Sequence, residues 1–326
     1  MIITRTPLRI SFAGGGTDLS GFYRRQRGAV LSTAINKYIY ITVNRKFDHK
    51  IRASYSVTEM VDRAADLKHE LIRDALKVTG IEGGIEITSI SDIPSRGTGL
   101  GSSSSYTVGL LNALYSYIGK MANAEKLAAE ACRIEIEICR KPIGKQDQYI
   151  AAYGGMQFIQ FNPDESVFVD PVLCERDLRE RLHRHLLMLY TGITRSANDV
   201  LDEQSRNTEH NGSTVEDLVR MRDLADQLRD CLCSGKLDGF GETLHAGWML
   251  KKRLAAGISN PEIDAWYDAA RRCGAIGGKL LGAGGGGFLL LCAPPECHTQ
   301  ICRALPKLTP VTFRFEPQGS KIIFIE

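Results

Sequence analysis

The sequence predicts an α+β fold in two domains, residues 1–180 and 181–326. The chain has 326 residues, and domains commonly contain about 100–200. Strand-like and helix-like segments are mixed along the chain without the strict alternation that a doubly wound parallel sheet requires. The charged run 174–185, CERDLRERLHRH, is the expected crossover between the domains, and it could itself form a helix.

Apolar periodicity predicts the elements of the first half. Strands are expected at 2–4, 9–12, 38–43, 84–89, 156–161 and 167–169. Helices are expected at 66–78, 102–118, 124–139 and 146–152. In 102–118, Val108, Leu111 and Leu114 fall on one face of a helix, which indicates the side that packs on the core.

The second half is predicted to begin and end with strands. The expected strands are 186–190, two that flank the glycines 282–287 (288–292 being the clear one), 311–315 and 321–325. The expected helices are 197–207, 215–233, 237–253, 261–273 and 295–305. Four of these helices follow the first strand before the next strand appears, which again favours an α+β arrangement.

The composition argues against nucleic acid and membranes as partners. The net charge of +3 is too small to favour either nucleic acid or an anionic membrane. The uncharged, mostly apolar stretch 280–295 contains five glycines and is too short to span a bilayer. Arg5 and Arg9 fall where an export signal needs an apolar run, so a cytoplasmic protein is expected. The nine cysteines form no CxxC pair, which predicts reduced thiols rather than a zinc site.

A segment rich in glycine and serine precedes the helix expected at 102–118. Glycine can adopt positive φ and approach a ligand closely, and the amides at a helix start attract anions. The segment therefore predicts a phosphate-binding loop, although serines there could also serve only as helix caps. No lysine follows Gly101, so the loop is not a Walker A motif. The residues expected to bind phosphate are Pro94, Gly97, Gly99, Leu100, Gly101, Ser102, Ser103, Ser104 and Ser105.

A later glycine cluster, 282–287, fits the dinucleotide fingerprint G-x-G-x-x-G. The segment after it, FLLL, predicts a strand rather than a helix, and no βαβ unit surrounds it. A Rossmann-type oxidoreductase therefore loses its support. A tight turn that lets the backbone approach a ligand is the better interpretation.

Three charged residues are candidates for the chemistry. Asp147 lies in a polar segment between two apolar ones, and Arg9 begins a strand that leads to the glycines 14–16. Glu135 lies among isoleucines on the helix expected at 124–139, where Glu137 competes for the same role. Each could instead be a surface charge, and periodicity does not decide between these alternatives.

The three glycine clusters, in this order, resemble the motifs of the GHMP kinase superfamily over essentially the whole chain. They are PLRISFAGGGTDL from Pro7, the loop 94–105 with its core GLGSS, and KLLGAGGGG from Lys279. Within the superfamily the chain most resembles D-glycero-D-manno-heptose 7-phosphate kinases, also through PIGKQDQYIAAYGG, YTGITRSA and GISNPEID. The resemblance implies a first domain like ribosomal protein S5 domain 2, a ferredoxin-like second domain, and ATP in the cleft between them.

The resemblance also implies roles for single residues. Asp147 would take or orient the proton of the acceptor hydroxyl, and Arg9 would pair with it and face the transferred phosphoryl group. Ser103 and Glu135 would bind Mg²⁺. The glycines 14–16 replace the Gly-Glu-His of galactokinases, which argues against galactose. The residues expected to contact the sugar are Gly15, Gly16, Thr17, Asp18, Gly284 and Gly285, with Asp18 holding hydroxyl groups.

The expected function is a kinase that uses ATP and Mg²⁺ to phosphorylate the anomeric C1 hydroxyl of heptose 7-phosphate. Its product, the 1,7-bisphosphate, would serve the synthesis of nucleotide-activated heptose and surface polysaccharide. One alternative is a kinase for a fucose- or galactose-like sugar. Another is a non-catalytic sugar sensor, but the presence of all the reactive residues argues against a sensor. ATP and a sugar phosphate are the expected partners of a monomer or homodimer.

A phosphate already present at C7 would need arginine or lysine partners. Arg195 is the first candidate for this contact, because it lies in the YTGITRSA segment. Each candidate could also be an ordinary solvated charge. The others are Lys251, Lys252, Arg24 and Arg25.

Overall fold

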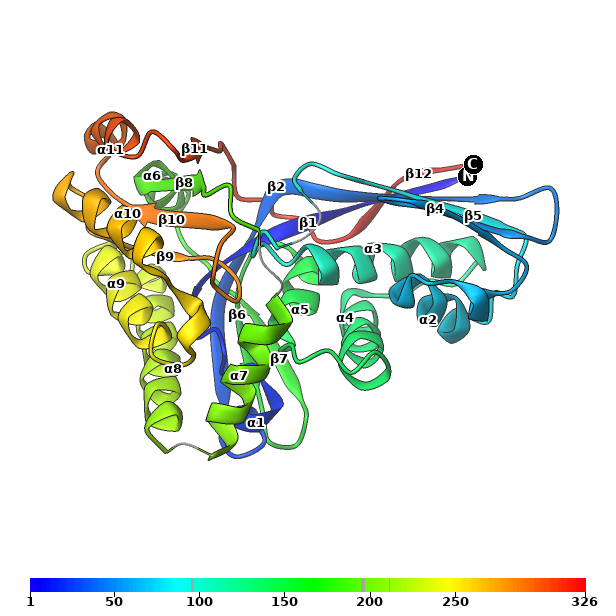
Figure 1. Ribbon diagram of the computed structural model, residues 1–326, viewed down its shortest axis with the longest axis horizontal. Helices are drawn as coiled ribbons and strands as arrows, with labels where there is room; N and C mark the ends of the chain where they lie inside the picture. Colours follow the sequence, from blue (N-terminus) through cyan, green and yellow to red (C-terminus); the bar gives the residue numbers. More distant parts are fainter. Residues whose placement is uncertain (95–96, 195–196, 211) are drawn as a thin grey trace.

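The computed structural model describes residues 1–94, 97–194, 197–210 and 212–326, which form two β-sheets with helices packed on them (Figure 1). The strands of the larger sheet are β1 Ile2–Ala13, β2 Gly28–Arg45, β3 Ile51–Ser54, β4 Thr58–Val61, β5 Ile85–Ser91, β6 Met156–Phe161, β7 Val167–Pro171 and β12 Lys321–Ile325. Their order is β12-β1-β2-β5-β3-β4, and β6 pairs with both β2 and β7. The two longest strands, β1 and β2, thus form the centre of the sheet.

Helices pack against one face of this sheet, chiefly through α3 and α5 (Figure 1). In chain order, the helices up to residue 185 are α1 Ser20–Tyr23, η1 Ala64–Asp66, α2 Glu70–Thr79, α3 Ser102–Tyr117, α4 Ala124–Cys132, the π-helix η2 Arg133–Ile138, α5 Gln146–Tyr153 and α6 Arg176–His185, the last of which lies beside the second sheet. The central helix is α3, which is buried from Ser104 to Tyr115 and packs against β1 and β2. The helices α2, α4 and α5 pack around it, so its N-terminus is held in place on several sides.

The second sheet has four strands and carries most of the remaining helices. Its strands are β8 Leu186–Tyr190, β9 Gly277–Leu280, β10 Phe288–Cys292 and β11 Thr309–Pro310. The helices are α7 Ala197–His210, α8 Gly212–Cys233, α9 Phe240–Lys251, η3 Ala256–Ile258, α10 Pro261–Arg272, η4 Pro295–Cys297 and α11 His298–Ala304. The antiparallel order β11-β8-β10-β9 is that of a ferredoxin-like βαββαβ unit with additional helices in its first crossover.

Caps recognisable in the sequence fix several helix ends. The side chain of Asn260 accepts a hydrogen bond of 2.9 Å from the amide of Ile263, and Pro261 occupies the first turn of α10. Asn123 caps α4 in the same way. The helix α2 ends at Gly80, whose φ of +74° is the left-handed conformation that commonly terminates helices.

The structure differs from the predicted elements at a few places. The segments expected as two short strands at 2–4 and 9–12 form one strand, β1, and the hairpin β3–β4 was not anticipated. The helix expected at 124–139 changes to a π-helix at Arg133. The segment 311–315 is not a strand, because it leaves the second sheet at Val311 and passes to the first, where Phe315 makes an isolated bridge with Ile35.

The end of the chain returns to the first sheet. The strand β12 pairs antiparallel with β1, and the two termini lie side by side (Figure 1). The division after residue 180 remains a prediction, and β12 is the part of 181–326 that lies in the other sheet. Within the described part of the chain, none of the helices combines the length and apolar composition that a membrane span requires.

Candidate active site

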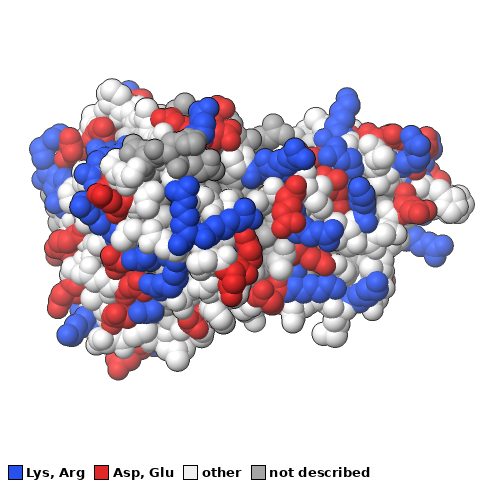
Figure 2. All heavy atoms as spheres, turned by 90° about the horizontal axis from the view of Figure 1, so that it is seen from below, with Lys and Arg blue, Asp and Glu red and all other residues white. Residues whose placement is uncertain are grey.

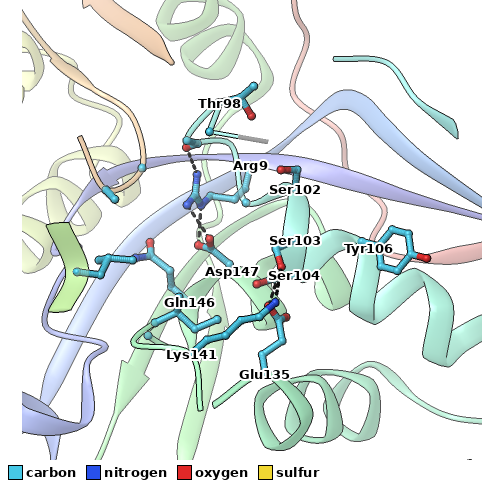
Figure 3. Close-up of a pocket in the computed structure, with 18 of the residues that line it drawn as sticks. Arg9, Thr98, Ser102, Ser103, Ser104, Tyr106, Glu135, Lys141, Gln146 and Asp147 are labelled. Atoms are coloured by element: carbon cyan, nitrogen blue, oxygen red, sulfur yellow. Dashed lines mark hydrogen bonds and ion pairs between the residues drawn. The ribbon is translucent and has the colours of Figure 1, made fainter. Parts of the chain in front are cut away.

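A cavity of about 1210 Å³ lies where the first sheet, α3 and loops of the second sheet meet. Its walls come from distant parts of the chain: Arg9 on β1, residues 97–99 and 101–104 before and at the start of α3, Asp147 on α5, Lys251 at the end of α9, and Gly282 after β9. Figure 3 shows the part of the cavity beside α3. Because both sheets contribute, the cavity depends on how they are packed together.

Three glycines determine the course of the loop before α3. Gly97, Gly99 and Gly101 have φ values of +68°, +75° and +74°, a left-handed backbone conformation in which a residue with a side chain would be strained. The helix begins directly behind them, and residues 102–104 line the cavity. A helix N-terminus that borders a cavity favours an anion there, which supports the predicted phosphate-binding loop.

Not every residue of the predicted loop faces this cavity. Leu100 is buried, and the hydroxyl of Ser105 donates a hydrogen bond of 2.8 Å to the carbonyl of Pro7. Pro94 is exposed and does not line the cavity. The amide of Arg9 also donates a hydrogen bond of 3.1 Å to the carbonyl of Leu100, so Leu100 and Ser105 anchor the loop on β1.

The two glycine-rich loops lie against each other, backbone to backbone. A Cβ atom on Gly99 would lie 2.3 Å from the carbonyl oxygen of Leu281, and one on Gly282 would lie 2.3 Å from Cα of Gly99. A Cβ atom on Gly287 would lie 2.3 Å from the carbonyl oxygen of Thr98. The predicted tight turn at 282–287 thus approaches the loop of the first sheet, while Gly284 and Gly285 do not line the cavity.

Arg9 and Asp147 form a bidentate ion pair at the centre of the cavity wall (Figure 3). The Nε and Nη2 atoms of Arg9 each donate a hydrogen bond of 2.7 Å to a different carboxylate oxygen of Asp147. Nη1 of Arg9 donates a bond of 2.6 Å to the carbonyl of Gly99 in the phosphate loop. The pair therefore ties β1, α5 and the loop together, and two parallel bonds fix the carboxylate plane.

Glu135 lies in the π-helix η2, with its carboxylate turned towards the start of α3 (Figure 3). It is fully buried and accepts hydrogen bonds from the hydroxyl of Ser103 (3.0 Å) and from Nε2 of Gln148 (3.2 Å). Burial raises the pKa of the Glu135 carboxyl. Glu137, the sequence alternative, is exposed, so the structure places only Glu135 in the cavity. Single-turn π-helices are frequent at functional sites.

The oxygen atoms of Ser103 and Glu135 are chemically suited to Mg²⁺. Magnesium prefers oxygen ligands and is usually held by one or two carboxylates together with phosphates and water. Nζ of Lys141 lies 4.0 Å from the Glu135 carboxylate and 3.3 Å from the Ser103 hydroxyl, and it also pairs with Glu70. Lys141 was not singled out in the sequence, because a lone lysine carries no motif.

Asp18 is buried at another wall of the cavity. Its Oδ1 accepts a hydrogen bond of 2.8 Å from the amide of Gly16, and its Oδ2 accepts one of 3.1 Å from the side chain of Gln146. Burial raises the pKa of Asp18, against the effect of the Gly16 bond, and the nearby Asp147 raises it further. A Cβ atom on Gly144 would lie 1.9 Å from Oδ2 of Asp18, so this approach requires glycine. Of the predicted sugar-binding residues, Gly15, Gly16 and Asp18 line the cavity, whereas Thr17 is buried beneath it.

Aromatic rings line the cavity near α2. His69 packs edge-on against Tyr55, with ring centroids 4.5 Å apart, and lies 5.2 Å from the ring of Tyr106. Ile90 and Ile93 line the same cavity. An apolar, aromatic wall of this kind suits a flat heterocycle. No sequence pattern indicates this wall, because the rings come from separate segments.

The structure separates the basic residues that were candidates for a sugar phosphate. Lys251 lines the cavity, whereas Lys252 pairs with Asp264 at 3.1 Å outside it. Arg24 and Arg25 are exposed and do not line the cavity. Arg195 lies outside the described residues. Lysine and arginine side chains alternate with acidic ones over the face in Figure 2, so surface charge on that face does not single out a phosphate site.

Two family models match the chain on either side of the cavity. The model of the GHMP kinases N terminal domain matches residues 59–155, which include the phosphate loop, Glu135 and Asp147. The model of the GHMP kinases C terminal matches residues 228–308, which include the loop 282–287. Together they cover more than half of the chain. The chain belongs to the GHMP kinase family.

Similar proteins that align with most of this chain support this assignment. D-glycero-alpha-D-manno-heptose 7-phosphate kinase of Campylobacter jejuni is 29% identical over 94% of this chain and 93% of its own length. Bifunctional fucokinase/GDP-fucose pyrophosphorylase of Arabidopsis thaliana is 26% identical to this chain. The aligned region covers 88% of this chain and 29% of that protein. A solved D-glycero-D-manno-heptose 1-phosphate kinase from Bacteriodes thetaiotaomicron has a TM-score of 0.83 at 23% identity, with full coverage of both chains.

These comparisons confirm the predicted family and the two-domain α+β fold. The protein is a sugar kinase of the GHMP family. A Rossmann-type oxidoreductase is excluded by the same finding.

Proposed function

We propose that this kinase transfers the γ-phosphoryl group of ATP to the anomeric C1 hydroxyl of D-glycero-D-manno-heptose 7-phosphate. The observation that carries the proposal is the Arg9–Asp147 pair, which lies beside the phosphate loop and shares the cavity with Asp18. That arrangement offers, in one cavity, a proton acceptor, a cation and a carboxylate that can accept hydrogen bonds from sugar hydroxyl groups.

In this proposal each residue acts through the atoms that face the cavity. An oxygen of Asp147 takes the proton of the sugar hydroxyl while the new O–P bond forms and the bond to the ADP oxygen breaks. Arg9 holds the Asp147 carboxylate in position and places positive charge beside the phosphoryl group. The start of α3 binds the phosphates of the nucleotide, and the Tyr55–His69 wall accepts its base.

Ser103 and Glu135 would hold Mg²⁺. Bound there, the ion would neutralise charge on the nucleotide phosphates. Gln148 keeps Oε1 of Glu135 in place through its 3.2 Å hydrogen bond, so one carboxylate oxygen is fixed from the protein side. Asp18, held by Gly16 and Gln146, would accept hydrogen bonds from sugar hydroxyl groups in the same cavity.

Heptose is the preferred sugar because two relatives of high coverage act, by their names, on heptose phosphates. One name places the phosphate of the substrate at C7 and the other at C1. A fucose-like sugar is the alternative that the match to a fucokinase favours. The position that reacts is therefore the point to test.

The test is an ADP-release assay with purified protein, ATP and Mg²⁺ on a panel of sugars and sugar phosphates. We expect the highest kcat/KM with heptose 7-phosphate, by about tenfold or more over unphosphorylated heptose. Phosphorus NMR of the product should show the new phosphate coupled to the anomeric proton. Better use of fucose or galactose, or phosphorylation of heptose 1-phosphate at C7, would overturn the proposal.

A further inference from the structure

A buried lysine in the cavity wall has no assigned role in phosphoryl transfer so far. Lys251, the last residue of α9, is 7% exposed and lines the cavity. Its Nζ donates hydrogen bonds to the carbonyl oxygens of Gly282 and, at 3.5 Å, of Leu280. Among the described residues it forms no ion pair, and carbonyl groups accept hydrogen bonds without neutralising a charge. Buried cations are ordinarily paired.

A second lysine nearby is in the same situation. Lys279, on β9, is 5% exposed, lines the cavity, and donates a hydrogen bond of 3.1 Å to the carbonyl of Phe12. In the part of the chain that the structure describes, it also lacks a carboxylate partner. Two unneutralised lysines that line one cavity indicate that an anion belongs between or beside them.

The position of Lys251 relative to the reacting centre follows from a chain of contacts. The carbonyl that Lys251 binds belongs to Gly282, which packs on Gly99, and Gly99 in turn accepts the hydrogen bond of Arg9. The heads of Lys251 and Arg9 are therefore joined through one backbone-to-backbone contact between the two glycine loops. Both face the cavity that the phosphate loop borders.

The charge state of Lys251 is compatible with anion binding. Burial, and then the charge of Arg9, lower the pKa of Lys251 to about 8, while Asp18 and Asp147 act in the opposite direction. Lys279 is the other cation that faces it, and its own pKa is depressed by burial and by Lys251. At pH 7 Lys251 is therefore mostly protonated, and an incoming anion would raise its pKa.

Taken with the proposed kinase function, on which this inference rests, the geometry points to one role. We propose that Lys251 is a further catalytic residue that binds the transferred phosphoryl group, with Lys279 as a second cation that lines the same cavity. Arg9 is already engaged by Asp147 and Gly99, so it leaves part of the phosphoryl charge unmatched. A group that strengthens its contacts as charge develops accelerates the transfer.

The chain offers a matched control for the test. Lys252 is the next residue, but it pairs with Asp264 at 3.1 Å outside the cavity. We would compare Lys251→Met, Lys251→Arg and Lys252→Met in full-length protein with the best acceptor of the panel. For Lys251→Met we expect kcat to fall by about 10²-fold or more, with both KM values within about threefold of wild type. Lys251→Arg should recover about tenfold of this loss, and Lys252→Met should stay within about twofold of wild type.

Binding measurements keep the proposal falsifiable if the variant is inactive for a structural reason. Lys251→Met should bind Mg·ADP as wild type does, but should bind Mg·ADP with aluminium fluoride, a mimic of the phosphoryl group in transfer, about tenfold or more weakly. In wild type, kcat/KM should decline above about pH 8 as Lys251 loses its proton, and this decline should be absent in Lys251→Met. Equal weakening with both probes would mean a structural role and would overturn the proposal.

A second result would also overturn it. If Lys251→Met raises only KM for a phosphorylated acceptor and leaves turnover of an unphosphorylated sugar unchanged, the lysine binds the phosphate of the acceptor instead. The test of Lys251 does not depend on the test of the proposed substrate, because the transferred phosphoryl group is the same for every sugar. If wild type prefers another sugar, the Lys251 measurements are made with that sugar and have the same meaning.

Discussion

Arg9 and Asp147 are joined by two hydrogen bonds of 2.7 Å, and a third bond of 2.6 Å holds the arginine on the carbonyl of Gly99. Neither side chain can turn without breaking a charge-assisted bond. The proton acceptor and the cation are thus oriented before any substrate is present. Preorganised charges of this kind stabilise a transition state without reorganisation at the moment of reaction.

The first prediction concerns the proton acceptor. Asp147→Asn preserves the shape of the side chain but removes its charge and its ability to take the proton, so kcat should fall by about 10²-fold or more. Affinity for Mg·ADP, measured by calorimetry, should stay within about threefold of wild type, because Asp147 does not belong to the phosphate loop. A variant that keeps more than about a third of wild-type kcat would show that Asp147 does not take the proton.

The second prediction concerns the metal site. Glu135 is buried beside Ser103, whereas Glu137 on the same π-helix is exposed. Glu135→Gln should therefore raise the Mg²⁺ concentration needed for half-maximal activity by about tenfold or more, because a neutral amide is a poor ligand for magnesium. Glu137→Gln is the matched control, and its Mg²⁺ dependence should follow that of wild type. The opposite pattern would assign the metal to Glu137.

At the level of elements, the alternation of isoleucine and glutamate over 134–138 explains why periodicity did not choose between the two glutamates, because it fits neither face of a helix clearly. In the structure Glu135 continues the buried face of α4, four residues after Ala131 and seven after Ala128, whereas Glu137 is exposed. The buried side is therefore set by the residues of α4, and the change to a π-helix at Arg133 occurs within it.

Other parts of the fold and site were predictable to different degrees. The helix of α3 and the strand β10 were located within a residue, because their apolar patterns are continuous and glycines mark their ends. The glycine loops could be located from the clustering of glycine in the sequence. In contrast, Lys141 and the ring of His69 carry no local pattern, and only tertiary packing brings them to the cavity. Site residues that belong to no motif are not accessible from a single sequence.

The hairpin β6–β7 supports the catalytic segment from outside the cavity. At its turn, Glu165 has a φ of +71° and accepts hydrogen bonds of 2.6 Å from Lys145, 2.6 Å from Arg24 and 2.8 Å from the hydroxyl of Tyr23. Lys145 immediately precedes α5, which carries Asp147. A non-glycine residue in this conformation is strained, and its three contacts hold it there.

The third prediction follows from the charge of this residue. Although burial acts to raise it, the bonds from Lys145, Arg24 and Tyr23 hold the pKa of Glu165 at about 2. A lowered pKa stabilises the folded protein above the ordinary glutamate pKa and loses this effect as the pH falls towards the lowered value. Glu165→Gln should thus lower the free energy of unfolding at pH 7 by about 0.5–1 kcal/mol, a modest value because the carboxylate is partly exposed.

The measurement is urea unfolding of wild type and Glu165→Gln between pH 7 and pH 3. The difference between the two proteins should shrink as the pH decreases, because Glu165 in the wild type becomes protonated. Glu82→Gln is a suitable control, since Glu82 is exposed and no ion pair joins it to another described residue. A difference that is constant over this pH range would assign the effect to backbone strain rather than charge.

For the molecule as a whole, the site depends on contact between the two sheets. The loop 282–287 follows β9 of the second sheet, and its backbone packs on Thr98 and Gly99 of the phosphate loop. Lys279, from the same strand β9, reaches the carbonyl of Phe12 at the end of β1. The second sheet thus does not only close the cavity but also positions the loop that is expected to bind phosphate.

The last prediction tests this dependence from the side of the second sheet. In Gly282→Ala the added Cβ would lie 2.3 Å from Cα of Gly99, and φ at this position is +72°, so one of the two loops must move. Because backbone rather than a flexible side chain is in the way, the change cannot be absorbed locally. We expect the Kd for Mg·ADP to rise by about tenfold or more, from a substitution in a loop that is not itself proposed to bind nucleotide.

Gly247→Ala, in α9, is the control, because its Cβ would make only an ordinary contact of 3.7 Å with Leu224 and alanine favours a helix. It should leave nucleotide affinity unchanged. If Gly282→Ala also bound Mg·ADP as tightly as wild type, the phosphate loop would hold its shape without the second sheet, and the contact between the two glycine loops would serve stability alone.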